Sequence, residues 1–465
     1  MRQTKNQIVN GVIWKQLLLF FFPLMLGTFF QVLYNTVDAV VVGRFVSKVA
    51  LAAVGGPTGV LIALVISFFI GITTGATVVI AQSYGAEDME RTSLALHTSV
   101  ALGLAGGAVI GVLGVSLSKW ALALMNTPPS VLPYAETYLK IFMGGSGLGL
   151  IYNVGASILR ARGDSKRPFY LLVAGTMLNI LLDLVFVARL GWGVAGAGWA
   201  TVISQGVSAW GVWILLTREE APFRLEWRKI RFNVPLLRTI VNIGLPAALQ
   251  SSMYAVANIV IQASVNSFGV NVVAAWTILG KSDALYWQMM GAFGMALSTF
   301  SGQNFGARKY DRVIESIRSC TVMAFIATVF ASGIMMTFAR QIYFFFTDDA
   351  EVVNIGMTVM KTMVPYYFTY VLIETLGGGI RGTGDSLVPT VMMAVGICVF
   401  RLCWVWFALP LHRTVTMLCW SYPISWVITS IPFIFYYRYS RWMERSIVRS
   451  GHVPSPKSAA APVNP

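Results

Sequence analysis

Twelve apolar segments of about 20 residues or more recur along the chain and constrain its fold more than any other feature. A segment of this length crosses the hydrocarbon core of a bilayer as a helix and is too long for a barrel strand. The sequence therefore predicts an all-α polytopic membrane protein with twelve transmembrane helices. The segments centre near residues 28, 66, 106, 146, 179, 206, 250, 287, 328, 366, 398 and 427.

The charged residues are few and lie between the apolar segments. Only 11% of the 465 residues are charged, whereas about a quarter of a soluble domain is charged. A net charge of +15 raises the possibility of nucleic-acid binding, but dispersed charges are better explained by membrane orientation. Most Lys and Arg residues share one side if the N-terminus is cytoplasmic. We expect a multi-pass protein of the bacterial cytoplasmic (inner) membrane, with both termini cytoplasmic and no nucleic-acid partner.

Two sequence motifs occur twice in one register. "QSYGA" (82–86) returns as "QNFGA" (303–307), and "RARGDSKRP" (160–168) returns as "RGTGDSLVP" (381–389). Both pairs are separated by 221 residues, which indicates an internal duplication. Because each copy holds six spans, both halves enter the membrane from the same side. The sequence therefore predicts two six-helix lobes of parallel topology with a central cleft.

The duplication also sets the predicted domain boundaries. These are an N-lobe (1–217, spans 1–6), a cytoplasmic connector (218–234), a C-lobe (235–440, spans 7–12) and a cytoplasmic tail (441–465). The tail is expected to be disordered because it is rich in Pro and small residues. The repeated glycines are expected to end helices in the left-handed conformation; they are Gly85, Gly163, Gly306 and Gly384.

Polar stripes mark three spans of the first half. A carboxylate at the centre of a membrane helix costs about 2.5–3.5 kcal/mol and suggests a function. Span 1 carries Asp38, span 5 carries Asn179 and Asp183, and span 6 carries Thr201. Such stripes can be hydrogen-bonded contacts between helices or a cation site. Two acids favour the cation site, because adjacent buried carboxylates repel each other.

The second half lacks these acids. The register images of Asp183 and Asp38 are Trp404 and Ile261. The charged residues of the C-lobe spans could form internal ion pairs or contact a substrate, and the sequence leaves both open. The residues predicted as possible substrate or cavity contacts in the two lobes are Gln31, Tyr34, Asn35, Gln205, Tyr254, Asn258, Lys281, Asp283, Glu374 and Arg401.

Several motifs of span 1 to span 10 resemble the multidrug and toxic compound extrusion (MATE) family. They are "QVLYNTVDAVVVGRF", "QSYGAED", "LRARGDSKRP", "NILLD" and "RGTGDS". The resemblance implies twelve helices in two lobes and drug efflux by cation antiport. In the DinF-like and related bacterial branch it implies a first-lobe cation site and a bending proline in span 1. The matching positions are Asp38, Asn179, Asp183 and Thr201 for the site and Pro23 for the hinge.

The resemblance implies export of amphipathic, cationic drugs in exchange for H⁺ or Na⁺ by alternating access. We expect no cofactor and no catalytic centre, since no HExxH, GxSxG or His cluster occurs. The expected partners are the drugs and membrane lipid, and the expected state is a monomer. The alternative is a flippase for lipids or lipid-linked oligosaccharides. A flippase should have a strongly basic cavity, whereas the charges inside these spans are mixed and few.

Overall fold

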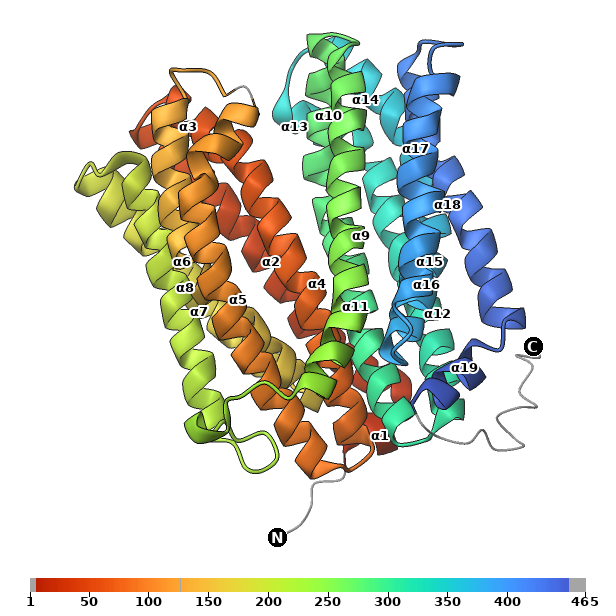
Figure 1. The fold of residues 1–465 in the computed structure, drawn as a ribbon. Coiled ribbons are helices and arrows are strands. Elements are labelled where there is room, and N and C mark those ends of the chain that lie inside the picture. The colour runs from red at the N-terminus through yellow and green to blue at the C-terminus, as the bar shows by residue number, and fades with distance from the viewer. Residues whose placement is uncertain (1–5, 126, 451–465) are drawn as a thin grey trace. The chain divides into compact units, whose positions relative to one another are not determined.

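The computed structural model describes residues 6–125 and 127–450, and all regular structure within them is helical (Figure 1). The helices of the first half are α1 (Gln7–Asn10), α2 (Ile13–Phe45), α3 (Lys48–Gly55), α4 (Pro57–Gly85), α5 (Met89–Leu124), α6 (Leu132–Arg162), α7 (Lys166–Asp183), the π-helical η1 (Leu184–Arg189) and α8 (Gly193–Thr217). A 3₁₀ turn, η2 (Trp227–Lys229), lies between the halves.

The second half is divided into more helical segments, several of which are short. They are α9 (Val234–Asn266), α10 (Val270–Ser282), α11 (Ala284–Gly306), α12 (Tyr310–Thr337), α13 (Ala339–Phe346), α14 (Ala350–Met363), the 3₁₀ turn η3 (Val364–Tyr366), α15 (Phe368–Gly382), α16 (Leu387–Met393), the π-helical η4 (Ala394–Val399), α17 (Phe400–Cys403), the π-helical η5 (Trp404–Ala408), α18 (Val415–Tyr439) and α19 (Trp442–Arg449).

Ten of these helices, or continuous runs of two to four helical segments, are long and apolar enough to cross a membrane. The other two predicted spans, 8 and 10, are helical but interrupted. Span 8 breaks at Asp283, between α10 and α11, and span 10 breaks at η3, which contains Pro365. All twelve predicted centres lie in helical segments, so the all-α prediction is confirmed.

The helices form two compact units. The first is Leu19–Ala248, and the second comprises the described residues up to Leu18 and from Leu249 onward. Helices α2 and α9 therefore each contribute residues to both units. The predicted lobe and connector boundaries remain predictions.

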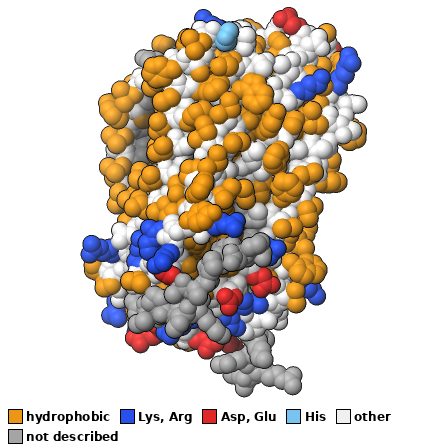
Figure 2. Space-filling view, turned by 90° about the vertical axis from the view of Figure 1, so that its right-hand side faces the viewer, with side chains coloured by type: hydrophobic (Ala, Val, Ile, Leu, Met, Phe, Trp, Pro, Cys, Tyr) orange, Lys and Arg blue, Asp and Glu red, His pale blue; other side chains and the backbone are white. Residues whose placement is uncertain are grey.

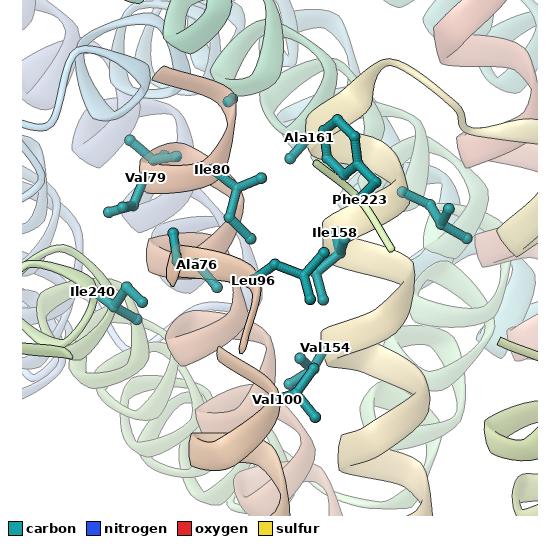
Figure 3. Packing of buried hydrophobic residues seen from close by; sticks show 14 of the residues in the cluster. Ala76, Val79, Ile80, Leu96, Val100, Val154, Ile158, Ala161, Phe223 and Ile240 are labelled. Atoms are coloured by element: carbon teal, nitrogen blue, oxygen red, sulfur yellow. The ribbon is translucent and has the colours of Figure 1, made fainter. Parts of the chain in front are cut away.

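The hydrophobic core of the first unit lies between α4, α5 and α6 (Figure 3). Ile80 of α4, Leu96 of α5 and Ile158 of α6 are fully buried in it. Burying an aliphatic side chain of this size stabilises a fold by about 1.5–3 kcal/mol where water is the alternative environment. Phe223 joins the same core from the connector, so this polar segment is anchored to the helices.

Ionic contacts hold the connector at the same place. Glu219 pairs with both Arg162 and Arg167, which lie within the first copy of the duplicated motif (160–168). The guanidinium of Arg162 also lies 5.6 Å from the ring centre of Phe223. One carboxylate held by two guanidiniums over a buried ring orders the connector against α6 and α7.

The prediction that disorder begins at residue 441 is wrong for residues 442–449, which form α19. Trp442 and Ile447 are buried and Trp442 stacks on Tyr437, so the segment has an apolar face that composition alone understated. Residues 451–465, for which the same prediction was made, lie outside the described residues.

The protein surface is apolar over much of its area. Figure 2 shows one face on which hydrophobic side chains cover most of the height, while most Lys and Arg side chains lie toward the lower end. Large side chains such as Phe407 and Trp406 are more than half exposed. A surface of this kind is expected where lipid replaces water as the solvent.

Candidate functional site

The four predicted cation-site residues all lie in the interior of the first unit. Asp38 of α2 is 4% exposed, and Asn179, Asp183 and Thr201 are 0% exposed. Asn179 and Asp183 are one helical turn apart on α7, so they share a face. Three apolar spans therefore each turn at least one of these four residues inward.

Two tyrosines connect these residues across helices. The Tyr34 hydroxyl of α2 donates a hydrogen bond to Thr201 Oγ1 of α8 at 2.9 Å. The Tyr138 hydroxyl of α6 donates to Asp38 Oδ2 at 3.0 Å. The site is therefore a polar cluster in which α2 is bonded to α6 and α8.

Apart from the contact between the two carboxyls themselves, five buried polar atoms of this cluster have no hydrogen-bond partner among the described residues. They are Asp38 Oδ1, both carboxyl oxygens of Asp183, and Asn179 Oδ1 and Nδ2. Buried polar atoms are almost always satisfied, and leaving each one unpaired costs about 1–3 kcal/mol. The two carboxyls also lie close enough for the charge on Asp38 to act on Asp183. Four unsatisfied oxygens and two interacting carboxyls fit a proton or a hard cation as the missing partner.

Tyr138 was not predicted from the sequence. Its span shows no polar stripe in the sequence. The neighbouring Glu136 and Lys140 pair with each other at 2.6 Å and do not point to the site. The available signal was weak: a tyrosine buried in an apolar helix usually needs an acceptor for its hydroxyl. The acceptor, Asp38, is 100 residues away in sequence.

We expect Tyr138→Phe to lower the half-saturating coupling-ion concentration about tenfold, since a hydrogen bond to a charged group contributes about 1.5–3 kcal/mol. The substitution removes the donor to Asp38 and keeps the ring. The carboxylate then gains more from binding a proton or cation. Transport measured over a range of ion concentrations tests this. Tyr134→Phe, on an exposed tyrosine of the same helix, is the control and should leave the curve in place.

The other first-unit residues predicted to contact substrate are less enclosed. Gln31 and Asn35 are exposed in the structure, and Gln205 is half-buried. Tyr34 alone of this group is hydrogen-bonded to a cation-site residue in the described chain. The structure therefore joins Tyr34 to the cluster by a hydrogen bond and shows no such bond for the other three among the described residues.

In the second unit, Asp283 lies where two interrupted spans meet. Its Oδ2 accepts hydrogen bonds from Trp287 Nε1 at 2.9 Å and from the Tyr367 hydroxyl at 2.8 Å. Asp283 ends α10, and Tyr367 follows the break η3. Irregular backbone at membrane depth is tolerated only where protein or a cavity surrounds it, so this contact joins the two breaks.

The charged residues of the second unit differ in the partners they contact, and their contact with a substrate stays a prediction. Glu374 pairs with Arg381 at 3.2 Å, as expected of an internal ion pair. Arg401 instead lies 3.8 Å from the ring centre of Tyr422 and donates to Ser425 Oγ at 3.1 Å. Within the described residues, neither Arg401 nor Asp283 has a salt-bridge partner.

The remaining C-lobe candidates do not form one cluster. Lys281 and Asn258 are exposed. The Tyr254 hydroxyl is buried and lies beside Tyr370.

A π-helical turn changes the register between the two halves in span 11. A π-bulge inserts one residue into a helix. Helix η4 precedes Arg401, whereas the corresponding residues 173–178 of the first half are α-helical. After η4 the register shifts by one, so Arg401 takes the sequence place of Asn179.

Comparisons with known proteins agree with this architecture. A sequence model of the MatE family matches residues 23–185 and 246–407. The chain is 28% identical over 447 residues to the probable multidrug resistance protein YoeA of Bacillus subtilis, which covers 94% of this chain and 96% of that protein. It is 26% identical over 400 residues to the probable multidrug resistance protein NorM of Thermotoga maritima, covering 83% and 84%.

A solved structure shares the fold. It is described as MATE in the bent conformation, with a TM-score of 0.87 and 23% identity, and the match covers 95% of this chain and 99% of that chain. At this identity the likeness establishes the fold alone.

Proposed function

The chain belongs to the MatE family, and we propose that it exports amphipathic, cationic xenobiotics in exchange for H⁺ or Na⁺. The multidrug resistance relatives support drugs as the cargo. The observation that carries the antiport proposal is the buried pair Asp38 and Asp183 with three oxygens that lack partners. Oxygen ligands suit a hard cation such as Na⁺, and close carboxyls equally suit a proton.

The proposed cycle couples charge at this cluster to the shape of α2. An outward-facing state takes up the ion at Asp38 and Asp183, which neutralises the repulsion between the carboxylates. Helix α2 then rearranges at Pro23, and the drug is released outside. The protein then returns to an inward-facing state, the ion leaves to the cytoplasm, and the drug binds from the cytoplasm. The membrane potential supplies about 2.3 kcal/mol per elementary charge per 100 mV.

Pro23 is suited to this bend. It lies inside α2, where proline removes one backbone hydrogen bond and favours a kink. A related transporter has been solved in a conformation described as bent. We propose that α2 bends at Pro23 in this chain, in a monomer of the bacterial inner membrane with both termini cytoplasmic.

Dye transport by the purified protein in liposomes tests this function. We would impose a proton gradient alone and then a Na⁺ gradient alone, with a cationic dye inside or outside. Movement driven by one gradient identifies the coupling ion. If neither gradient moves dye, the antiport proposal is wrong, and movement of a fluorescent phospholipid between leaflets would then support the flippase alternative.

A further inference from the structure

The last turns of α18 carry an exposed apolar stripe that ends in arginine. Ile431, Ile434 and Phe435 are 48%, 42% and 60% exposed and lie at i, i+3 and i+4. The next position on this face, i+7, is the exposed Arg438. Tyr439 beside it is 67% exposed. A lipid-facing stripe that passes into tyrosine and arginine marks the level at which acyl chains give way to headgroups.

Helix α19 adds further arginines at the same end of α18. Arg441 has a positive φ of 51° and turns the chain into α19. Arg441, Arg445 and Arg449 follow at i, i+4 and i+8 and are exposed, whereas Trp442 and Ile447 face inward. The helix therefore presents a row of guanidiniums away from the packed side. We call Arg438, Arg441, Arg445 and Arg449 the arginine row.

The described acids near this row do not neutralise it. Asp385 is paired with Arg449 at 3.4 Å, and its side chain is only 3% exposed. Glu444 is the one acid within α19. Arg438 and Arg445 have aromatic rings beneath them, those of Tyr439 and Tyr436, and no salt bridge within the described chain. The row thus keeps a net positive charge next to an apolar, lipid-facing surface.

We propose that the arginine row binds the phosphate groups of anionic phospholipids. The charge is complementary to a phosphodiester, and the guanidinium geometry matches its oxygens. The exposed stripe of α18 supplies contact for the acyl chains of the same lipid. A lipid is favoured over a free phosphate because the apolar and basic surfaces are continuous.

Bound lipid would hold α19 against the second copy of the duplicated motif. Ser446 Oγ lies 3.2 Å from Thr383 Oγ1, and Asp385 accepts a hydrogen bond from the Tyr436 hydroxyl at 2.8 Å. These contacts tie α19 and the end of α18 to the turn between α15 and α16. Anionic lipid is therefore expected to stabilise this end of the second unit.

The test compares two double variants of the full chain. Arg441→Gln/Arg445→Gln removes two charges from the row and spares Arg449. Arg340→Gln/Arg413→Gln is the matched control, since these exposed arginines also lie over rings, and Arg413 is at the other end of α18. Detergent-purified protein is titrated with phosphatidylglycerol, with phosphatidylcholine or with inorganic phosphate. Bound lipid is measured by native mass spectrometry, and stability by the thermal unfolding midpoint.

We expect phosphatidylglycerol to bind and to raise the unfolding midpoint of wild type and control. In the row variant its affinity should fall about 30-fold, since each basic residue near an anionic surface contributes about a fivefold affinity. Equal binding by both variants would overturn the proposal. The proposal would also be overturned if phosphatidylcholine bound as tightly as phosphatidylglycerol, or if inorganic phosphate alone saturated the arginine row. The assay measures no transport, so its outcome is independent of the proposed antiport.

Discussion

Asp183→Asn is expected to abolish ion-driven export while leaving the protein folded. The amide has nearly the same shape as the carboxyl, but it cannot take up a proton or contribute a charge to a bound cation. Within the described residues the Asp183 oxygens have no partner besides the Asp38 carboxyl, and an amide can still donate to that carboxyl. A bound cation and the Asp183 carboxylate would form a buried pair of opposite charge, and removing one partner of such a pair costs about 3–5 kcal/mol, so apparent ion affinity should fall by at least about 100-fold.

The measurement is dye efflux from liposomes under the coupling gradient, with dye binding and the unfolding midpoint measured in parallel. Asp38→Asn should behave similarly, although it also alters the acceptor of the Tyr138 hydroxyl. Asp283→Asn is the matched control, because Asp283 is a buried acid whose Oδ2 already has two donors. Unchanged ion dependence in both Asp183→Asn and Asp38→Asn would exclude the first-unit cluster as the coupling site.

The core of this site could be predicted from sequence because its residues break a strong pattern. A carboxylate in a long apolar helix is conspicuous, and Asn179 and Asp183 are one turn apart. Tyr138 could not be found in the same way, since tyrosine is ordinary in apolar helices and its acceptor lies on another span. Helical periodicity identifies the face of one helix, but it does not tell which faces meet.

The duplicated glycines show that local sequence patterns also have limits within a single helix end. Gly163 and Gly384 end their helices with φ of 104° and 94°, as predicted. For Gly85 and Gly306 the prediction is wrong, because both are the last helical residues. The left-handed residues there are Glu87 and Arg308, each two positions later. A glycine permits the left-handed conformation, but the closing hydrogen bonds decide which residue adopts it.

Breaks within spans were also beyond the sequence patterns. Span 10 contains Pro365, which permits an interruption. Span 8 breaks at Asp283, where no proline or glycine occurs. The reason is tertiary, since Asp283 and the Tyr367 hydroxyl meet across the two breaks. Hydropathy could count these spans but could not show that they are discontinuous.

Gly75→Val is expected to prevent the first unit from folding, because the closest approach between α4 and α9 leaves no room for a side chain. A Cβ at Gly75 would lie 2.2 Å from the Ile240 carbonyl oxygen and 2.8 Å from the Gly244 backbone nitrogen. At Gly71 it would lie 2.3 Å from Ala248 Cα. Glycines four apart on one helix facing small residues on another are typical of close packing between membrane helices.

The atoms that such a side chain meets are backbone, so no rotamer change can relieve the clash and the helices must separate. Overpacking of this kind costs about 1–3 kcal/mol or more even where side chains can adjust, so Gly75→Val should leave little monodisperse protein. Gly75→Ala should be milder but still lower the unfolding midpoint. Gly55→Ala, whose Cβ would meet nothing within 4 Å, is the control and should match wild type. Size-exclusion yield and thermal unfolding of the three variants measure this, and a wild-type profile for Gly75→Val would mean that α4 and α9 do not approach this closely.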